Sequence, residues 1–180
     1  MVSTTSYYTN NCIKEAVVAK GCNPESYHML FAYLPGLTTV RFECDTANDE
    51  IKNPKSIRSM FVGSSNIETI EFPSGVSFKD LEDASYAFSK CSKLNTVIFN
   101  NTTNAKLSSC VSMFDSSSKL STITGIEDFD VSEVEEFTKM FQKCNALTNL
   151  DLSNWDVSNA KNFDYMFYQC SELTSLNIDE

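Results

Sequence analysis

The sequence predicts an α/β solenoid, in which about six short repeats stack along one axis, with a parallel β-sheet on one face and short helices on the other. A phenylalanine that anchors each repeat recurs after 30, 27, 26, 27 and 26 residues, and apolar residues keep fixed distances from it. A steady period of 26–27 residues is typical of proteins whose repeats each form one supersecondary unit. The anchors are Phe31, Phe61, Phe88, Phe114, Phe141 and Phe167.

Four apolar columns run through the repeats. A leucine or isoleucine stands six residues after every anchor, and a leucine, isoleucine or valine stands nine residues after it. The position before the anchor is always apolar and is most often methionine. The position four before the anchor holds Tyr27, Ile57, Ala84, Cys110, Phe137 and Phe163. The agreement of every row indicates that each repeat buries the same positions.

Each repeat is expected to begin with a short helix. In the fifth repeat, apolar residues recur every three or four positions from Val131 to Cys144, which places them on one stripe of a helix. Ser132, followed three residues later by Glu135, has the form of a capping box at the start of that helix.

Each repeat is expected to end in a short strand. After Cys144 the apolar positions are Leu147, Leu150 and Leu152, which end in the two-residue alternation of a strand. Equivalent strands stacked at a fixed interval pair in parallel, so we expect one sheet along one face. The extra residues of the longer repeats fall at 47–54, Phe72-Pro73 and Thr124-Gly125, where loops or bulges would absorb them.

The chain is expected to divide into an N-terminal capping segment, residues 1–23, and a solenoid, residues 24–180. Within the first, NNCIKEAVVAKG reads as a short amphipathic helix that ends at Gly21 and covers the core of the first repeat. The last strand, in LTSLNIDE, is followed by no capping element. We therefore expect an open edge with unpaired backbone groups there.

The charge of the chain excludes some partners. The 24 acidic and 14 basic residues give a net charge of −10, which repels phosphate backbones and anionic membrane surfaces. The N-terminus has no basic start followed by an apolar run of signal-peptide length, and no run of about 18 apolar residues occurs. We expect no nucleic-acid partner, no membrane insertion and no readable export signal, which leaves the location unknown.

The stretch LDLSNWDVSNAKNFDYMFYQCSELTSLNI, from Leu150 to Ile178, closely resembles the BspA-type leucine-rich repeat. The typical unit of that family reads roughly Leu-x-Leu-Ser-x-Trp-Asp-Thr-Ser-x-Val-x-x-Met-x-x-Met-Phe-x-x-Cys-x-x-Leu. The resemblance covers the later repeats well and the first two loosely. It implies a leucine-rich-repeat solenoid of a kind found mainly in secreted or surface proteins, with roles in adhesion and protein binding. The lack of an export signal favours an intracellular or virion protein instead.

The reactive side chains give little support for catalysis. The seven cysteines show no zinc-ligand spacing, and the column of Cys91, Cys144 and Cys170 reads as buried structural thiols. Catalysis at His28, the single histidine, would require a thiol and an orienting group beside it. The chain has no glycine-rich phosphate loop, HExxH or nucleophile elbow. We expect no enzyme, no catalytic residue and no cofactor.

The stretch DLSNWD, where Asp151 and Asp156 flank Ser153 and Asn154, is a candidate metal site. Oxygen ligands of these kinds bind calcium. The preceding repeat reads IEDFDV and lacks the Ser-Asn pair, so a loop is the simpler interpretation. We therefore expect no metal ion.

The side of the strands that faces away from the core is the candidate binding surface. Its inner column is almost all small and hydroxylated, which strand propensity alone would explain. A flat polar surface is also what solenoid proteins use to hold a partner. The candidate residues are Thr39, Arg41, Thr69, Glu71, Thr96, Ile98, Thr122, Thr124, Asn149, Asp151, Ser175 and Asn177.

Two functions follow as hypotheses. The first is a non-enzymatic protein–protein interaction module, an adhesion-type leucine-rich-repeat domain that binds a protein partner of unknown identity through this surface. The second is a structural component of a larger assembly such as a virion. That component would dock on neighbours, or on another copy, through its open C-terminal edge.

Overall fold

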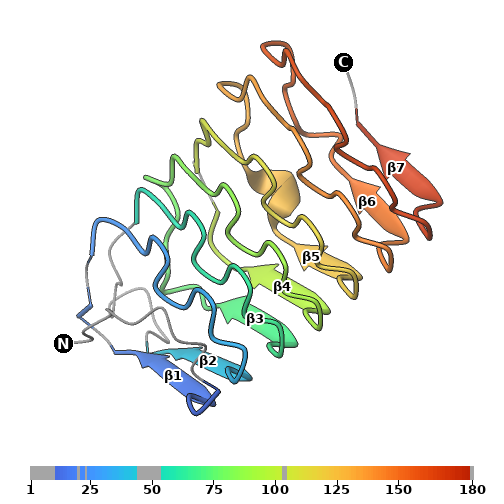
Figure 1. Cartoon of the computed structure of the whole chain (residues 1–180). Coiled ribbons are helices and arrows are strands. Elements are labelled where there is room, and N and C mark those ends of the chain that lie inside the picture. Colours follow the sequence, from blue (N-terminus) through green and yellow to red (C-terminus); the bar gives the residue numbers. More distant parts are fainter. Residues whose placement is uncertain (1–10, 20, 23, 44–53, 103–104, 179–180) are drawn as a thin grey trace.

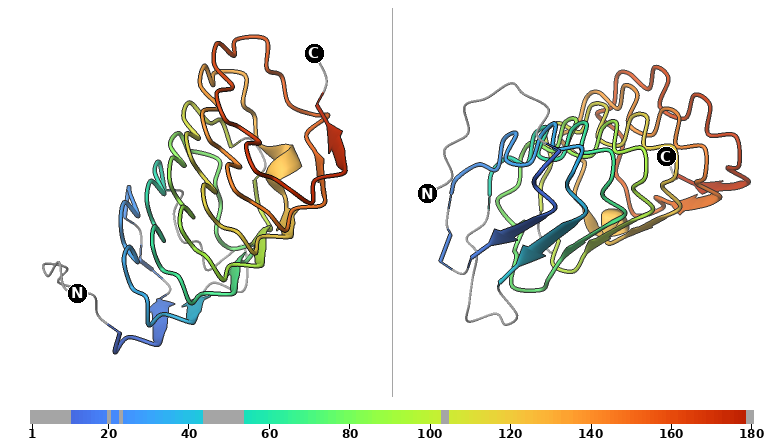
Figure 2. Two further views of the ribbon diagram at one scale, coloured as in Figure 1. Left: turned by 45° about the vertical axis from the view of Figure 1, so that its right-hand side comes forward. Right: turned by 60° about the horizontal axis from the view of Figure 1, so that its bottom comes forward.

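The computed structural model describes residues 11–19, 21–22, 24–43, 54–102 and 105–178. They form a parallel β-solenoid of about six turns, which confirms the solenoid prediction. The strands lie along one side of the stack, and tight turns lie along the opposite side (Figure 1; Figure 2, both views). The strands are β1 (Glu15–Val18), β2 (Thr39–Phe42), β3 (Thr69–Phe72), β4 (Thr96–Phe99), β5 (Thr122–Thr124), β6 (Asn149–Asp151) and β7 (Ser175–Asn177).

The anchor phenylalanines form a continuous stack through the core. The rings of Phe61 and Phe88 are 5.8 Å apart between centroids, and those of Phe88 and Phe114 are 5.2 Å apart. The stack continues to Phe141 and Phe167, each 5.5 Å from the ring before it. The recurring anchor thus supplies one ring per repeat, stacked on the rings of its neighbours; Phe61, Phe88, Phe114 and Phe141 are buried, and Phe167 is partly buried.

The predicted helices on the face opposite the sheet are wrong. In the described part of the chain the single helical element is η1, a 3-10 turn at Ile126–Asp128. In every repeat the residues two positions before and two positions after the anchor have positive φ, as at Lys139 (φ 59°) and Lys143 (φ 60°). A right-handed helix needs negative φ throughout, so two such residues in each repeat exclude it.

Tight turns replace each helix. Met140 N–H donates to Phe137 O within its own repeat (3.1 Å), whereas Phe141 N–H donates to Met166 O of the next repeat (3.0 Å). The same alternation recurs along the solenoid, and we call this face the turn ladder. In these turns a backbone N–H bonds to the carbonyl oxygen three residues earlier. Apolar side chains therefore recur at the same three- and four-residue spacing as in a helix. The sequence pattern therefore could not separate the two structures.

The predicted capping box is also absent, because no helix starts there. Ser132 N–H donates to Asp130 Oδ1 instead (2.9 Å). The Glu135 carboxylate pairs with Lys161 Nζ of the next repeat at 2.7 Å. The Asp130 side chain thus stabilises a turn, and the Glu135 side chain makes a contact between repeats.

The N-terminal segment is a strand, and its predicted helix is wrong. β1 pairs in parallel with β2, with Glu15 opposite Thr39 and Val17 opposite Arg41. Val18 is buried while Glu15 is exposed, so β1 has the alternation of an edge strand. Pairing with β2 and the strand propensity of the β-branched valines favour a strand here over the helix that the sequence pattern predicts. The division of the chain at residues 23 and 24 stays a prediction.

Among the described residues, the strands fall into three sheets, ordered β1-β2, β3-β4-β5 and β6-β7. The predicted loop at 47–54 lies outside the described residues, apart from Pro54, and follows β2. The extra residue at Phe72-Pro73 lies in a turn that Val76 N–H closes on Pro73 O (2.8 Å). The extra residue at Thr124-Gly125 lies at the end of β5, where the second break in the sheet begins.

Candidate functional site

The structure places all twelve candidate residues on strands β2 to β7, with each side chain exposed or half-buried. We call these outward side chains the strand face. The register aligns Thr69, Thr96 and Thr122 in one row of the central sheet. On β6 and β7, Asp151 stands opposite Asn177. The rows are interrupted between β5 and β6, because these strands belong to different sheets.

The charged side chains of the strand face are held by neighbours. The Arg41 guanidinium lies 3.7 Å from the Glu15 carboxylate, and both are more than half exposed. Asn100 Nδ2 donates to Glu71 Oε1 at 3.2 Å. Hydrogen bonds from the side chain and backbone of Ser153 hold the pKa of Asp151 below its usual value. Asp151 therefore presents an ionised carboxylate to solvent.

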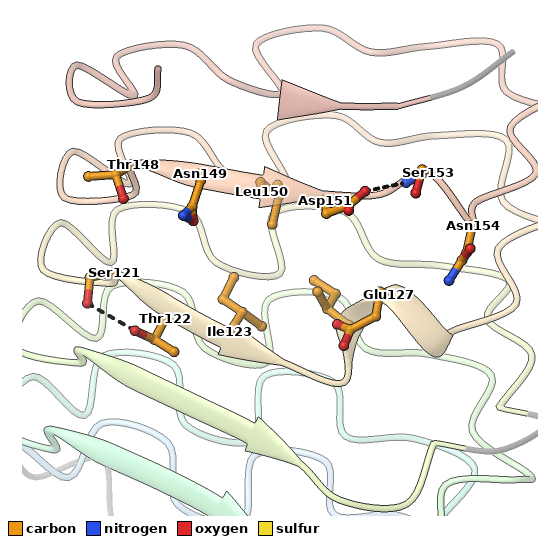
Figure 3. Close-up of a pocket in the computed structure, with 11 residues that line it drawn as sticks. Ser121, Thr122, Ile123, Glu127, Thr148, Asn149, Leu150, Asp151, Ser153 and Asn154 are labelled. Atoms are coloured by element: carbon orange, nitrogen blue, oxygen red, sulfur yellow. Dashed lines mark hydrogen bonds between the residues drawn. The ribbon is translucent and has the colours of Figure 1, made fainter. Parts of the chain in front are cut away.

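A polar cleft separates β5 from β6 on the strand face, and the sequence reasoning missed it. Its volume is about 610 Å³, and outward side chains of both strands line it together with residues of η1 and of the loop after β6 (Figure 3). Ile123 and Leu150 contribute apolar atoms at its base. The remaining lining residues are Ser121, Thr122, Ile126, Glu127, Thr148, Asn149, Asp151, Ser153 and Asn154.

Next to the cleft, the fourth repeat lacks a core side chain that the other repeats carry. Eleven residues after the anchor the other repeats carry Phe42, Phe72, Phe99, Leu152 and Ile178, whereas this repeat carries Gly125. Gly125 has a φ of 81°, and a side chain on it would collide with the carbonyl oxygen of Phe99. After Gly125, η1 brings Ile126 into the core. In the sequence, a glycine at a position where the other repeats carry a bulky apolar residue is the signal that could have indicated an irregularity at this place.

Trp155 fixes the far end of the cleft. Its indole is buried, stacks at a tilt on Phe137 with ring centroids 5.7 Å apart, and donates from Nε1 to Ile126 O at 3.0 Å. This bond crosses from the repeat of β6 to the repeat of β5. The tryptophan of the repeat motif therefore anchors η1 and the rim of the cleft.

The cysteine column is a series of hydrogen-bond donors between repeats. Cys144 Sγ donates to Phe114 O at 3.3 Å, and Cys91 Sγ donates to Phe61 O at 3.1 Å. Where the column holds serine, Ser117 Oγ makes the equivalent bond to Phe88 O at 2.6 Å. Burial raises the pKa of Cys91 to about 12 and that of Cys144 well above its usual value. These thiols stay protonated and serve as donors to backbone carbonyls.

The other groups considered for chemistry do not assemble. His28 is exposed, and its backbone N–H donates to Ser26 Oγ at 3.0 Å. Asp151 and Asp156 each accept the N–H of the residue two positions later, so each caps its own turn. Within the described ranges, no three His, Cys, Asp or Glu side chains group closely enough to hold a metal ion. The same ranges contain no helix with the length and apolar character of a membrane span.

Comparisons with known proteins identify a family and include a distant solved structure. The model of the family described as "Mycoplasma protein of unknown function, DUF285" matches residues 82–179, which is more than half of the chain. None of the curated proteins compared with the chain matches it. A leucine-rich cell surface protein from Faecalibacterium prausnitzii A2-165 has a TM-score of 0.33 and 13% identity, over 93% of this chain and 60% of that protein. The chain thus spans less than two thirds of that protein, and a similarity this low supports no functional argument.

Proposed function

The chain belongs to the family described as "Mycoplasma protein of unknown function, DUF285", and from this premise we propose that it is a non-enzymatic protein–protein interaction module. It holds a protein partner on the strand face in the manner of an adhesion-type leucine-rich-repeat domain. The resemblance of Leu150–Ile178 to BspA-type repeats supports the adhesion type. The observation that carries the proposal is the strand face itself, a row of polar side chains aligned by strand register.

The scaffold behind this face supports binding because it is fixed on the opposite side. In the turn ladder, Phe88 N–H donates to Met113 O at 2.9 Å and Phe114 N–H donates to Met140 O at 2.9 Å. The ring stack and the column of thiol and hydroxyl donors add further bonds between the same repeats. A surface that is already ordered loses little conformational entropy when a partner binds.

The partner that fits this face is a protein surface with basic character. The chain carries a net charge of −10, and Glu71 and Asp151 project from the strand face. Complementary charge raises the rate of association and selects the partner. Arg41 at the N-terminal end gives the face a polarity of charge, because it lies one sheet away from Glu71 and two sheets away from Asp151.

A triple variant tests this function. Changing Arg41, Glu71 and Asp151 together to alanine should abolish capture of a partner selected from a phage-displayed library of protein fragments. The matched control changes Lys79, Glu136 and Asp164 to alanine, which removes the same charges from exposed positions outside the strands. Circular dichroism during heating should show that both variants fold. Undiminished capture by the strand-face variant would overturn the proposal.

A second candidate function is a structural component that self-associates through its C-terminal repeat. Phe163 is 43% exposed, whereas Phe137 in the same column is fully buried. Leu176 is 39% exposed, against 7% for Leu150. Sedimentation velocity over a range of concentrations should show a dimer that Phe163→Ser and Leu176→Ser together dissociate. A monomer at every concentration would exclude this function.

A further inference from the structure

We propose that the cleft between β5 and β6 binds an extended peptide segment with a basic side chain, which adds as a strand between the two. The inference rests on the proposed function, because it assigns one subsite of the strand face and the kind of partner segment it takes.

The rim on β5 presents unpaired backbone groups to the cleft. Thr122 N–H donates to Asn95 O, on the β4 side, at 3.1 Å. In a parallel ladder the N–H and C=O of one residue point to the same neighbour, and successive residues point to opposite neighbours. The backbone of Ile123 therefore points toward β6, with which β5 shares no ladder.

The rim on β6 is complementary. Leu152 N–H donates to Asn177 O at 2.7 Å, and Ser175 N–H donates to Thr148 O at 3.3 Å, so alternate residues of this segment bond to β7. By the same alternation, the backbones of Asn149 and Asp151 point toward β5. Both rims thus offer donors and acceptors to a strand placed between them, which is the basis of recognition by strand addition.

The opening is built into the fold. β5 and β6 belong to different sheets and share no ladder, unlike β4 with β5 and β6 with β7. On the turn ladder their repeats stay joined by Ser112 N–H to Thr138 O (3.0 Å) and by Ser116 N–H to Gln142 O (2.8 Å). At the far end the bond from Trp155 Nε1 to Ile126 O holds the rim. A cleft fixed on both sides is preorganised, so a peptide does not have to separate the strands.

The size and charge of the cleft select a basic peptide. Its volume of about 610 Å³ lies within the usual range of ligand clefts, about 300–1,000 Å³. The Glu127 and Asp151 side chains stand on opposite rims (Figure 3). None of the described lining residues is basic or aromatic, so the cleft offers no counter-charge of its own and no ring for a sugar to stack on. A lysine or arginine between the two carboxylates supplies the missing charge.

The test begins with a phage-displayed random heptapeptide library selected on the full chain. Calorimetry then measures the selected peptide as a synthetic ligand. Selected peptides should share a lysine or arginine, and Glu127→Gln with Asp151→Asn should weaken binding more than tenfold. Glu136→Gln with Asp164→Asn, a matched change outside the strand face, should leave the affinity unchanged. Changing Asn149 to proline removes an N–H that points into the cleft and gives a second variant with the same expected loss.

Backbone methylation separates strand addition from binding by side chains alone. A peptide methylated on a single central amide nitrogen loses one ladder bond and should bind at least tenfold more weakly. A library that yields no binder, binders without a basic residue, or tolerance of every methylation would overturn the inference. If the Arg41, Glu71 and Asp151 triple variant loses its partner while the Glu127 and Asp151 pair and the methylated peptides bind normally, the cleft assignment fails and the proposed function stands.

Discussion

The role of the cysteine column can be tested by replacing Cys144 with valine and, separately, with serine. Cys144 is fully buried, and its Sγ donates to Phe114 O at 3.3 Å. That carbonyl also accepts Ser117 N–H at 3.1 Å, so it keeps one partner when the thiol is removed. Valine retains the apolar volume but cannot donate. The expected loss is one net hydrogen bond, about 1 kcal/mol in the free energy of unfolding.

Serine should be tolerated at the same site. Ser64 and Ser117 occupy this column in other repeats, are fully buried, and donate to Phe31 O and Phe88 O. Cys144→Ser therefore keeps the donor, and we expect its free energy of unfolding to stay within about 1 kcal/mol of the parent. Urea denaturation followed by circular dichroism measures both variants, with an unchanged m-value showing that the two states compared are the same.

The opposite ranking would refute this reasoning. If the column were simple apolar packing, valine would match or exceed cysteine, and a buried serine hydroxyl would cost about 1–3 kcal/mol. A valine variant as stable as the parent, together with a serine variant destabilised by that amount, would show that the bond to Phe114 O contributes nothing. The two explanations thus predict opposite rankings of the valine and serine variants.

Three further predictions concern a glycine, a carboxylate and the thiols. Gly125→Ala should lower the free energy of unfolding by about 2 kcal/mol, seen in thermal melts, because a side chain at positive φ is strained and collides with a carbonyl. Hydrogen bonds from Ser153 lower the pKa of Asp151 in the folded protein. The stabilisation that they give is therefore present above about pH 4 and is lost as the pH falls through the lower pKa of the folded state. NMR of the Asp151 carboxyl carbon should show this lowered pKa. Cys22 is exposed and should react with a thiol reagent in the native protein, whereas Cys91 should react only after denaturation, as mass spectrometry of the labelled peptides would show.

Each of these has a control or a contradicting outcome. Gly63→Ala also places a side chain at positive φ, but it meets only the side chain of Tyr33, so it should cost less than Gly125→Ala. Equal losses would show that the contact with Phe99 does not matter. A measured pKa of the Asp151 carboxyl group above its usual value would contradict the described bonds to Ser153. Native labelling of Cys91 at the rate of Cys22 would show that the core opens locally.

The period and columns of the sequence were sufficient to predict the solenoid, because each repeat buries the same residues. The anchor Phe141 and the inward Leu150 lie in the core as predicted. Outward positions such as Thr96 and Asp151 lie on strands at the expected places. Strand alternation alone fixes which side chains face out, so this part of the candidate surface followed from spacing.

Other features depend on backbone conformations that side chains do not signal. Lys139 and Lys143 adopt positive φ, although glycine is the residue that usually marks it, so the turn ladder could not be told from a helix. β1 forms because a neighbouring strand is present, which short-range pattern does not report. The cleft was predictable only in part, since Gly125 breaks the column but the separation of β5 from β6 is a property of the stack.

The turn ladder affects where the solenoid bends most easily. Between β5 and β6 the repeats are joined by the turn ladder and by the bond from Trp155 Nε1 to Ile126 O, but the strands share no ladder, so this joint resists bending less than the joint between β3 and β4. Bending about it changes the width of the cleft, with the turn ladder on the side that stays joined. A ligand bound in the cleft would stiffen this joint. The curvature of the solenoid would then change with the fraction of clefts that hold a ligand.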